Sequence, residues 1–484
     1  MTEHAIPQPH KTASPILEDD ISVKSKPSQE NTGPESRPTE GDDTNTALTR
    51  FEYSSKPALT HAQTDIEGRD TPESSPRKSA YVQMAAICLS LFLAGWNDGS
   101  TGPLLPRIQE VYHVSYGIVS LLFLSSSLGF ILGGVASVYF VGHFGFGKAM
   151  VIGRTCSLNV CQPRSEVVLL GSLIQIVGYC IQAPGPPFPA FVVAFFLNGF
   201  VESLQACQLP LNRTMTDDAR SAHKRTGTGA LTAPLVSTQF AQLPRWSFHY
   251  LVSLGVACMN TCTLLAVFRL KMQDDCLREV GEVVAERGQS KDNVYTQILR
   301  LKAVHLIALF MLMYVGVEVT IGGWIVSYII NVRGGGSSSG YISSGFFGGL
   351  ALGRIGLLWV NKKLGNRLAV FLYIVTATGL ELIVWLVPSL ISGAIAISIV
   401  GLLIGPIYPI VVNEASHILP GWLLSGSIGW IAGVATTGAA ALPFIAGQLA
   451  QEKGIWSLQP LLISMMVSMT LLWLIIPKGH QRIE

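Results

Sequence analysis

The side chains in this sequence that are best placed to do chemistry are four acidic residues inside long apolar stretches: Asp98, Glu202, Glu318 and Glu381. A carboxylate at the depth of a lipid bilayer is costly, so it usually pairs with a neighbour or lines a path for protons or polar ligands. These residues therefore predict exchange of protons with water, or hydrogen bonding to a polar ligand.

Uncharged polar and aromatic side chains in similar stretches are candidates for binding a polar ligand by hydrogen bonds and ring stacking. They are Asn97, Gln205, Gln208, Tyr314, Trp324 and Asn413. Each of them alone is more often a packing residue, because polar side chains also join helices in lipid. Small residues spaced four apart, at Gly129 and Gly133 and again at Gly349 and Gly353, predict close contact between helices.

Other kinds of site are not indicated. The sequence has no arrangement of Ser, His and Asp, or of Cys and His, that would activate a nucleophile. Its 8 cysteines are scattered, mostly inside apolar runs, and lack the CxxC pairs typical of zinc sites. We therefore expect no catalytic centre, no metal and no cofactor, and we do not expect an enzyme.

Twelve apolar stretches, each near the roughly 20 residues that a helix needs to cross hydrocarbon, must position these side chains. Lipid offers no water to satisfy backbone groups, so such stretches must be helices. We place them at 80–105, 115–142, 165–182, 188–211, 226–242, 247–268, 302–330, 340–360, 367–388, 390–413, 422–446 and 456–477. The predicted fold is an all-α membrane protein.

The composition agrees with a chain that faces lipid. Hydrophobic residues make up 49% of the 484 residues and charged residues only 13%, which is more apolar surface than a soluble globule can bury. The net charge of +2 provides no basic surface for nucleic acid. We expect the partners to be the lipid bilayer and small molecules, and the chain to be a monomer.

The twelve stretches fall into two groups of six. Residues 1–78 are rich in Ser, Thr, Pro and charged residues and predict a disordered cytoplasmic tail. A charged segment at 269–301 predicts a cytoplasmic linker between a first six-helix bundle, 79–268, and a second, 302–478. Residues 479–484 form a short cytoplasmic tail.

Lysine and arginine in the loops predict the orientation, because positively charged loops stay in the cytoplasm. From residue 77 onward, 22 of 26 such residues lie on the side of the tail and four on the other: Arg107, Arg245, Arg333 and Lys453. Both termini are therefore expected in the cytoplasm. We expect a multi-pass protein of the plasma membrane, with a vacuolar or other internal membrane as the alternative.

An internal repeat relates the two groups of stretches. A shift of 220 residues places Asp98 on Glu318, Gly102 on Gly322, Gly129 on Gly349, Gly133 on Gly353 and Gly145 on Gly365, and a shift of 209 matches 229–242 with 438–451. Because six is an even number, the paired helices keep the same orientation. The repeat predicts two pseudo-symmetric six-helix bundles in parallel, with a ligand path between them.

The change of shift leaves about eleven extra residues in the first half. A polar segment at 154–166 is the candidate, either as a genuine loop or as a gene-model error. A second such error could lie in 210–225, where the sequence is also unusual. Sequencing of the transcript would separate these alternatives.

Glycine-patterned loops occur in both halves, at 133–148 and 353–367, and five further segments are distinctive: GWNDGSTGPLLP (95–106), YVGVEVTIGGW (314–324), WSFHYLVSLG (246–255), GLLIGPIYPIVVN (401–413) and GSIGWIAG (426–433). Through these segments the chain resembles the major facilitator superfamily over residues 79–478. These segments are similar to fungal proteins of the bypass-of-stop-codon type and, more distantly, to proton-coupled fucose permeases. The resemblance implies alternating access by rocking of two halves around a central cavity.

Two departures from the superfamily pattern bear on this expectation. The Asp-Arg pair usual in the first of these loops falls on Gly142 and His143, so the charged gate is degenerate in both halves. The signature of drug antiporters in the fifth span is approached only by Gly229, Ala233 and Pro234. Antiport is therefore less favoured than symport, but it stays open.

The resemblance sharpens the expected roles of the acids. Asp98 matches an acid of fucose permeases and has an acidic repeat partner in Glu318, so we predict that it is the principal protonation site, with Glu318 as second. Glu202 matches another permease acid approximately and is the third candidate for proton coupling. Glu381 lies in the ninth span, which the superfamily fold places at the periphery, so we expect a structural pairing there.

The leading hypothesis is a secondary active transporter that moves a small organic solute, such as a sugar, by alternating access coupled to protons. One alternative is efflux of a fungal secondary metabolite, which a neighbouring synthase cluster would favour. A third is a membrane scaffold or sensor that has lost transport, for which the degenerate loops and the long tail argue. Solute flux in vesicles separates the third from the first two.

Overall fold

The computed structural model describes residues 76–143, 165–206, 216–268 and 294–477, all within one compact unit. In these ranges the regular structure is helical, without strands. The helices of the first half are α1 (Pro76–Tyr112), α2 (Tyr116–Val119), α3 (Leu121–His143), α4 (Ser165–Gln182), α5 (Phe188–Ala206), α6 (Thr216–Ala241), η2 (Trp246–Phe248) and α7 (His249–Phe268).

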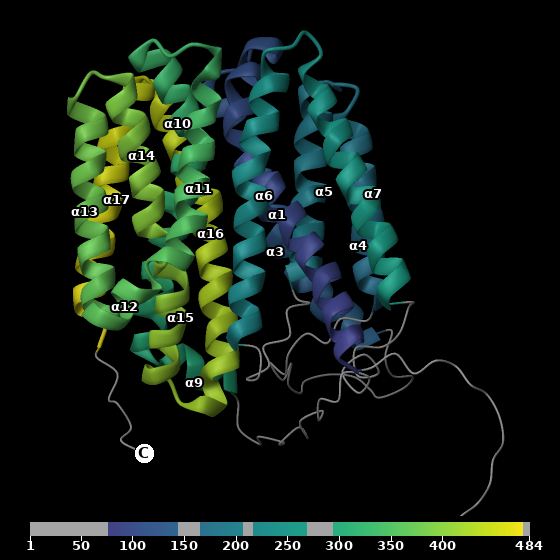
Figure 1. Ribbon diagram of the computed structural model, residues 1–484, viewed down its shortest axis with the longest axis vertical. Helices are drawn as coiled ribbons and strands as arrows, with labels where there is room; N and C mark the ends of the chain where they lie inside the picture. Colours follow the sequence, from purple (N-terminus) through teal and green to yellow (C-terminus); the bar gives the residue numbers. More distant parts are fainter. Residues whose placement is uncertain (1–75, 144–164, 207–215, 269–293, 478–484) are drawn as a thin grey trace, which may run out of the picture. The chain divides into compact units, whose positions relative to one another are not determined.

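The second half repeats this order after the short helix α9 (Val294–Arg300), as Figure 1 shows. It consists of α10 (Lys302–Arg333), η3 (Ser337–Gly340), α11 (Tyr341–Gly356), α12 (Leu358–Leu364), α13 (Asn366–Leu386), α14 (Leu390–Ile404), α15 (Ile407–Ile418), α16 (Gly421–Lys453), η4 (Ile455–Ser457) and α17 (Leu458–Ile475).

The helices occur at the twelve positions that the apolar stretches predicted. Eight of the described helices are long and apolar enough to cross a bilayer, and a ninth is the pair of α11, extended by η3, with α12, which is bent by 53°. The other three positions are occupied by α1, α4 and α6, which are less apolar or shorter in their described parts. The all-α membrane fold is thus confirmed.

Some boundaries differ from the prediction. Helix α6 begins at Thr216, about ten residues earlier than expected, and the span predicted at 390–413 is divided into α14 and α15 around Pro406. A proline has no backbone N–H to donate, so it interrupts a helix at this point. The suspect segment at 154–166 and the linker lie largely outside the described residues, as do most of the predicted tails, whereas the second suspect segment, 210–225, is described from Thr216 on as the first part of α6.

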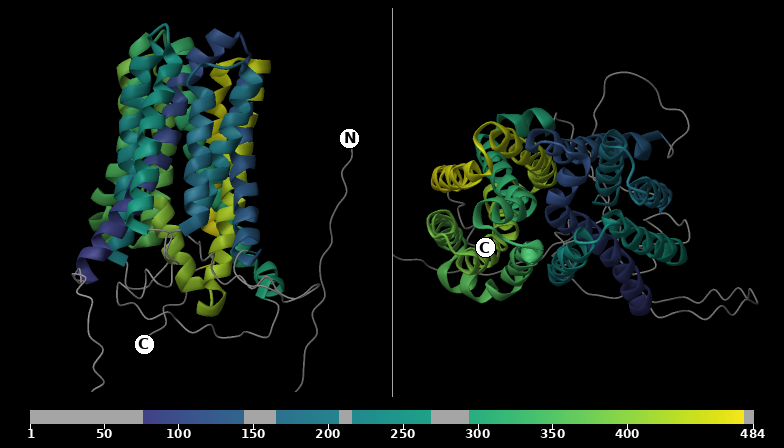
Figure 2. Two further views of the ribbon diagram at one scale, coloured as in Figure 1. Left: turned by 90° about the vertical axis from the view of Figure 1, so that its right-hand side faces the viewer. Right: turned by 90° about the horizontal axis from the view of Figure 1, so that it is seen from above.

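Matching helices pair in the same way in the two halves (Figure 2). In the first half α1 packs against α6 and α7, α3 against α5, and α4 against α5 and α7. In the second half α10 packs against α16 and α17, α11 against α14, and α13 against α14 and α17. Each of these pairs has its counterpart under the sequence repeat. The chain therefore forms two pseudo-symmetric six-helix bundles.

Glycines determine how closely the helices approach within each bundle. A Cβ atom on Gly129 or Gly133 would collide with backbone atoms of α5, and one on Gly349 or Gly353 would collide with backbone atoms of α14. The first pair and the second are repeat partners, and so are the helices that they touch. The interpretation of these glycines as sites of close helix contact is confirmed.

The two bundles meet through α1 and α10, α3 and α16, and α6 and α11. We call the end where α1 begins and α17 ends the tail end, and the opposite one the far end. Three hydrogen bonds join the bundles in the described part of the chain, and all lie at the far end. Gln448 Nε2 donates to the Gly117 carbonyl over 3.1 Å, Gln242 Nε2 donates to the Ser337 carbonyl over 3.5 Å, and Gln239 donates to the Tyr341 hydroxyl.

Candidate functional site

Asp98 and Glu318 come together because of where α1 crosses α10. The crossing point is Gly102 against Gly322, where a Cβ atom on Gly102 would collide with the Gly322 carbonyl oxygen. Each acid lies four residues before its glycine, hence one turn nearer the tail end on the same helix face. The two carboxyl groups are within electrostatic range of each other. The Asp98 side chain is exposed to solvent, although it lies between the bundles.

Arg354 of α11 forms an ion pair with Glu318. Its Nη2 atom lies 3.6 Å from Glu318 Oε1, and the two side chains are 15% and 20% exposed. Its Nε atom donates to the Gly405 carbonyl over 3.4 Å. The hydroxyls of Tyr314 and Tyr408 lie within electrostatic range of this pair, and their rings are 6.4 Å apart. The second bundle thus supplies one acid that is already compensated.

The first bundle has no equivalent of this arginine. Under the shift of 220, Arg354 corresponds to Gly134, whereas Glu318 corresponds to Asp98. Asp98 makes no ion pair within 4.0 Å in the described part of the chain, although it is within electrostatic range of Arg354. The two halves therefore differ in charge at this position. Of the two repeat-related acids, Glu318 has an arginine partner within 4.0 Å and Asp98 has none in the described structure.

Glu202 of α5 is a further acid of the same cluster. It lies within electrostatic range of Asp98, and its buried Oε1 atom has no hydrogen-bond partner among the described residues. Tyr179 of α4 lies within range of both acids. Gln205, one turn further along α5, donates to Gln175 Oε1 over 3.1 Å and so joins α5 to α4.

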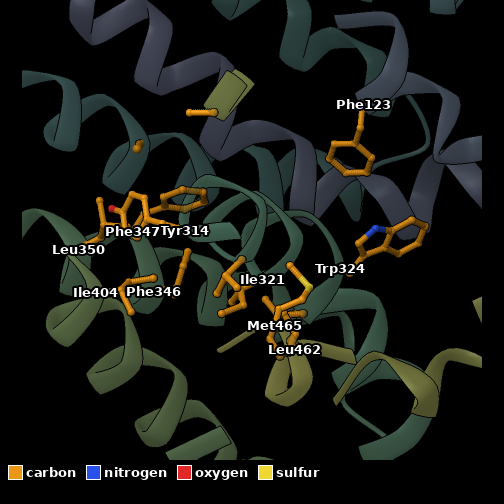
Figure 3. Packing of buried hydrophobic residues seen from close by; sticks show 14 of the residues in the cluster. Phe123, Tyr314, Ile321, Trp324, Phe346, Phe347, Leu350, Ile404, Leu462 and Met465 are labelled. Atoms are coloured by element: carbon orange, nitrogen blue, oxygen red, sulfur yellow. The ribbon is translucent and has the colours of Figure 1, made fainter. Parts of the chain in front are cut away.

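The structure places the other predicted ligand-binding residues differently. Asn97 precedes Asp98 and is partly exposed, and Asn413 is exposed on α15 without a side-chain hydrogen bond to the described residues. Trp324 is fully buried; its indole donates to the Pro443 carbonyl over 2.9 Å, and its ring lies 6.0 Å from that of Phe123. Figure 3 shows these two rings together, away from Tyr314. Gln208 lies outside the described residues.

Trp324 is therefore part of the contact between the bundles, and its indole is not available to a ligand in this state. Glu381 is also separate from the cluster. It is completely buried in α13 beside Gln459 of α17, and neither side chain has a hydrogen bond of good geometry in the described structure.

Sequence reasoning missed Arg354 and His249. Arg354 was counted among the loop charges, although it falls inside the span predicted at 340–360, and a cation at that depth is itself a signal of function. His249 is fully buried and stacks on Trp96 with ring centroids 5.6 Å apart, and its Nε2 atom is 2.9 Å from Ser100 Oγ. No spacing in the sequence indicated this link between α1 and α7.

The cluster thus consists of three acids and one arginine at the junction of two repeated bundles. Comparison with models of protein families identifies the family to which this architecture belongs. The family model described as Major Facilitator Superfamily matches residues 87–423. The chain belongs to the major facilitator superfamily. Members of this superfamily are transporters, not enzymes, so the function of the chain, stated coarsely, is secondary transport across a membrane.

Similar proteins within the superfamily include fungal and bacterial members. The chain is 25% identical over 433 residues to "Bypass of stop codon protein 6" of Saccharomyces cerevisiae, covering 81% of this chain and 83% of that protein. This relative agrees with the branch that the sequence motifs indicated.

Three solved structures share the fold. The first is a D-xylose-proton symporter, with a TM-score of 0.64, 11% identity, and coverage of 83% of this chain and 98% of that one. The second is the nucleoside transporter NupG, with a TM-score of 0.61, 10% identity, and coverage of 82% of this chain and 100% of that one. The third is the E. coli fucose:proton symporter, with a TM-score of 0.55, 14% identity, and coverage of 83% of this chain and 100% of that one.

Proposed function

We propose that this superfamily member couples the movement of a small polar organic solute to protons, and that Asp98 is the principal proton carrier. The observation that supports this most directly is the broken repeat. Asp98 is exposed between the bundles and has no counterpart of Arg354, whereas its repeat partner Glu318 is paired. An uncompensated carboxylate at this depth is stabilised by binding a proton, and water access lets the proton exchange.

Glu202 and Glu318 extend the proposed proton site. Glu202 is the second uncompensated acid, since its buried oxygen has no hydrogen-bond donor in the described part of the chain. Glu318 competes with Asp98 for the single guanidinium of Arg354. Loss of the Asp98 charge on protonation therefore changes the attraction between α1 of one bundle and α11 of the other. Such a differential interaction is what a ligand or proton needs to shift a two-state equilibrium.

The contacts between the bundles support alternating access. In the described part of the chain the inter-bundle hydrogen bonds lie at the far end, so this state is closed there. On α16, Cβ atoms on Gly429 and Gly433, nearer the tail end, would meet nothing within 4 Å. We infer that the tail end is the open side and, from the loop charges, that it faces the cytoplasm.

The residues near the acids and the structural neighbours support a solute class. Asn97, which precedes Asp98, is partly exposed, and the hydroxyl of Tyr314, buried in this state, lies within electrostatic range of Glu318. Three structural neighbours are described as a D-xylose-proton symporter, a nucleoside transporter and a fucose:proton symporter. We propose a polar solute of that size, carried by a monomer of the plasma membrane.

Flux in reconstituted vesicles tests the proposal. The full-length chain is inserted into liposomes with a pH-sensitive dye inside, and D-xylose, L-fucose and uridine are added in turn. Uptake of one of them together with protons is expected. Solute flux without proton movement would refute coupling, and the absence of flux for a broad panel of polar solutes would favour the non-transporting alternative.

A further inference from the structure

A cavity at the far end, lined by polar and apolar residues alike, lies apart from the acid cluster. Its volume is about 1120 Å³, and its walls come from both bundles: the far ends of α1 and α6 with α2 on one side, and of α10 and α16 with η3 on the other. The contact between Thr238 and Gly340 that joins the bundles forms part of its lining. We call this cavity the vestibule.

The repeat continues in the vestibule wall. Gln242 and Gln451 are partners under the shift of 209, and both line the cavity; Ala241 and Ala450 are a second such pair. A molecule bound here would therefore touch equivalent positions of both bundles at once.

The charges of the vestibule cancel each other. Arg107 and Glu110 are its only charged lining residues, and Arg107 Nη1 donates to Glu110 Oε2 over 2.6 Å. The lining therefore carries no net charge and no unpaired charged group, so an ionic ligand would lose hydration without gaining a counter-charge there. The vestibule is thus suited to uncharged molecules.

Hydrogen-bonding capacity is present around this neutral pair. The side chains of Gln109 and Gln451 line the cavity and have no hydrogen-bond partner within the described residues, and the Asn331 amide donates only to its own helix, leaving its oxygen unused. Val326 and Ile330 of α10 add apolar surface beside Asn331, and Pro103 and Val114 add apolar surface on the side of the first bundle. Amides dispersed among apolar side chains match a molecule whose hydroxyl groups alternate with C–H groups.

We propose that the vestibule is a second binding site, for uncharged polyhydroxylated small molecules, separate from the acid cluster. It exists while the far end is closed, because the contacts between Thr238 and Gly340 and between Gln448 and Gly117 lie beneath or beside it. The ligand bridges the bundles and so stabilises this closed state.

Protection of a cysteine from labelling tests the proposal without any need for transport. Ser337 is exposed on the vestibule wall, so Ser337→Cys is introduced in a Cys180→Ser background and treated with a membrane-impermeant maleimide from the far side of vesicles. The probes are D-xylose, glucosamine and glucuronate, which share a sugar scaffold and differ in charge. D-xylose should slow labelling by about tenfold at ten times its Kd, as mass action requires.

Matched variants identify the place of binding. Leu243→Cys, exposed at the far end but outside the vestibule lining, should label at the same rate with and without D-xylose. Protection at position 337 should disappear when Gln109 and Gln451, whose side chains make no hydrogen bond in the described structure, are both changed to leucine, and should persist in Asp98→Asn. Three outcomes would each overturn the proposal: protection by glucosamine and glucuronate as strong as that by D-xylose, loss of protection in Asp98→Asn, or no protection by D-xylose.

Discussion

Gly102 and Gly322 lie backbone against backbone where α1 crosses α10, and they are the same position of the internal repeat. The pseudo-twofold axis that relates the bundles therefore passes close to this contact. Asp98 and Glu318, one turn away, are brought to the axis by it. The glycine contact can therefore be altered by substitution at Gly102 without changing either acid.

Gly102→Ala should destabilise the protein, because the added methyl group would overlap the Gly322 carbonyl and force the helices apart. Overpacking of this kind costs about 1–3 kcal/mol. The measurement is the thermal unfolding midpoint of the purified protein in detergent. Gly433→Ala on α16 is the control, since a Cβ atom there meets nothing within 4 Å; equal midpoints for the two variants would contradict the crossing.

Asp98→Asn should abolish proton-driven accumulation of solute while leaving expression and solute exchange in place. The amide keeps the size of the side chain and its access to water but cannot carry the proton. Proton flux accompanying solute in reconstituted vesicles is the decisive measurement. Glu381→Gln is the comparison, because that acid is buried in the second bundle away from the cluster. Undiminished coupling in Asp98→Asn would exclude Asp98 as the carrier.

Arg354→Gln should lower stability more than the double variant Arg354→Gln with Glu318→Gln. The single change leaves the Glu318 carboxylate without its partner, whereas the double change removes both charges. Because the two charges lie 3.6 Å apart and both side chains are partly exposed, we expect a difference of about 1 kcal/mol. A double-mutant cycle on unfolding midpoints measures the coupling, and strictly additive effects would show that the pair does not interact.

Cross-linking the bundles at the far end should stop solute flux. In Thr238→Cys with Gly340→Cys, the new Cβ atom at position 340 lies 3.0 Å from that of residue 238, near enough for a disulfide after a small shift. Oxidation should block flux and reduction should restore it. Gly171→Cys with Leu204→Cys, at 3.6 Å within the first bundle, is the matched control and should leave flux intact. Flux through the oxidised inter-bundle variant would refute rocking.

Tags at Met1 and Glu484 should both resist protease added outside intact cells. The reason is the excess of Lys and Arg on the tail side, 22 against four. Tags placed after Leu243, in the loop that follows α6, should be cleaved. Digestion of either terminal tag would show that the predicted orientation is wrong. The inference that this state opens to the cytoplasm would then be wrong as well.

Features that repeat along the chain, or that recur with a regular spacing, could be predicted from the sequence. Apolar length located the helices, and the spacing of Gly129 and Gly133 predicted a packing contact that the structure contains. The matched positions of Asp98 and Glu318 also placed both acids on corresponding helices, from which their proximity follows once the bundles pair.

Long-range pairing was beyond the sequence, because nothing local specifies it. Arg354 stands in a stretch that could equally have ended in a loop, and only the packing of α11 against α14 brings its Nε atom to the Gly405 carbonyl. Trp324 has the composition of a ligand-binding aromatic residue, yet the approach of α3 places Phe123 against it. The roles of the acids remain predictions for the variants above.

The contact between the repeat partners Gly102 and Gly322 also bears on the history of the chain. Fusion of two copies of a six-helix protein that formed a twofold dimer would place one residue of each copy face to face on the axis. Two identical acids in that position would have repelled each other whenever both were charged. An arginine at position 354, with only Gly134 at the matching place in the other copy, relieves that conflict on one side. Unequal charges in the two halves at this crossing are what such a fusion would need in order to keep both acids near the axis.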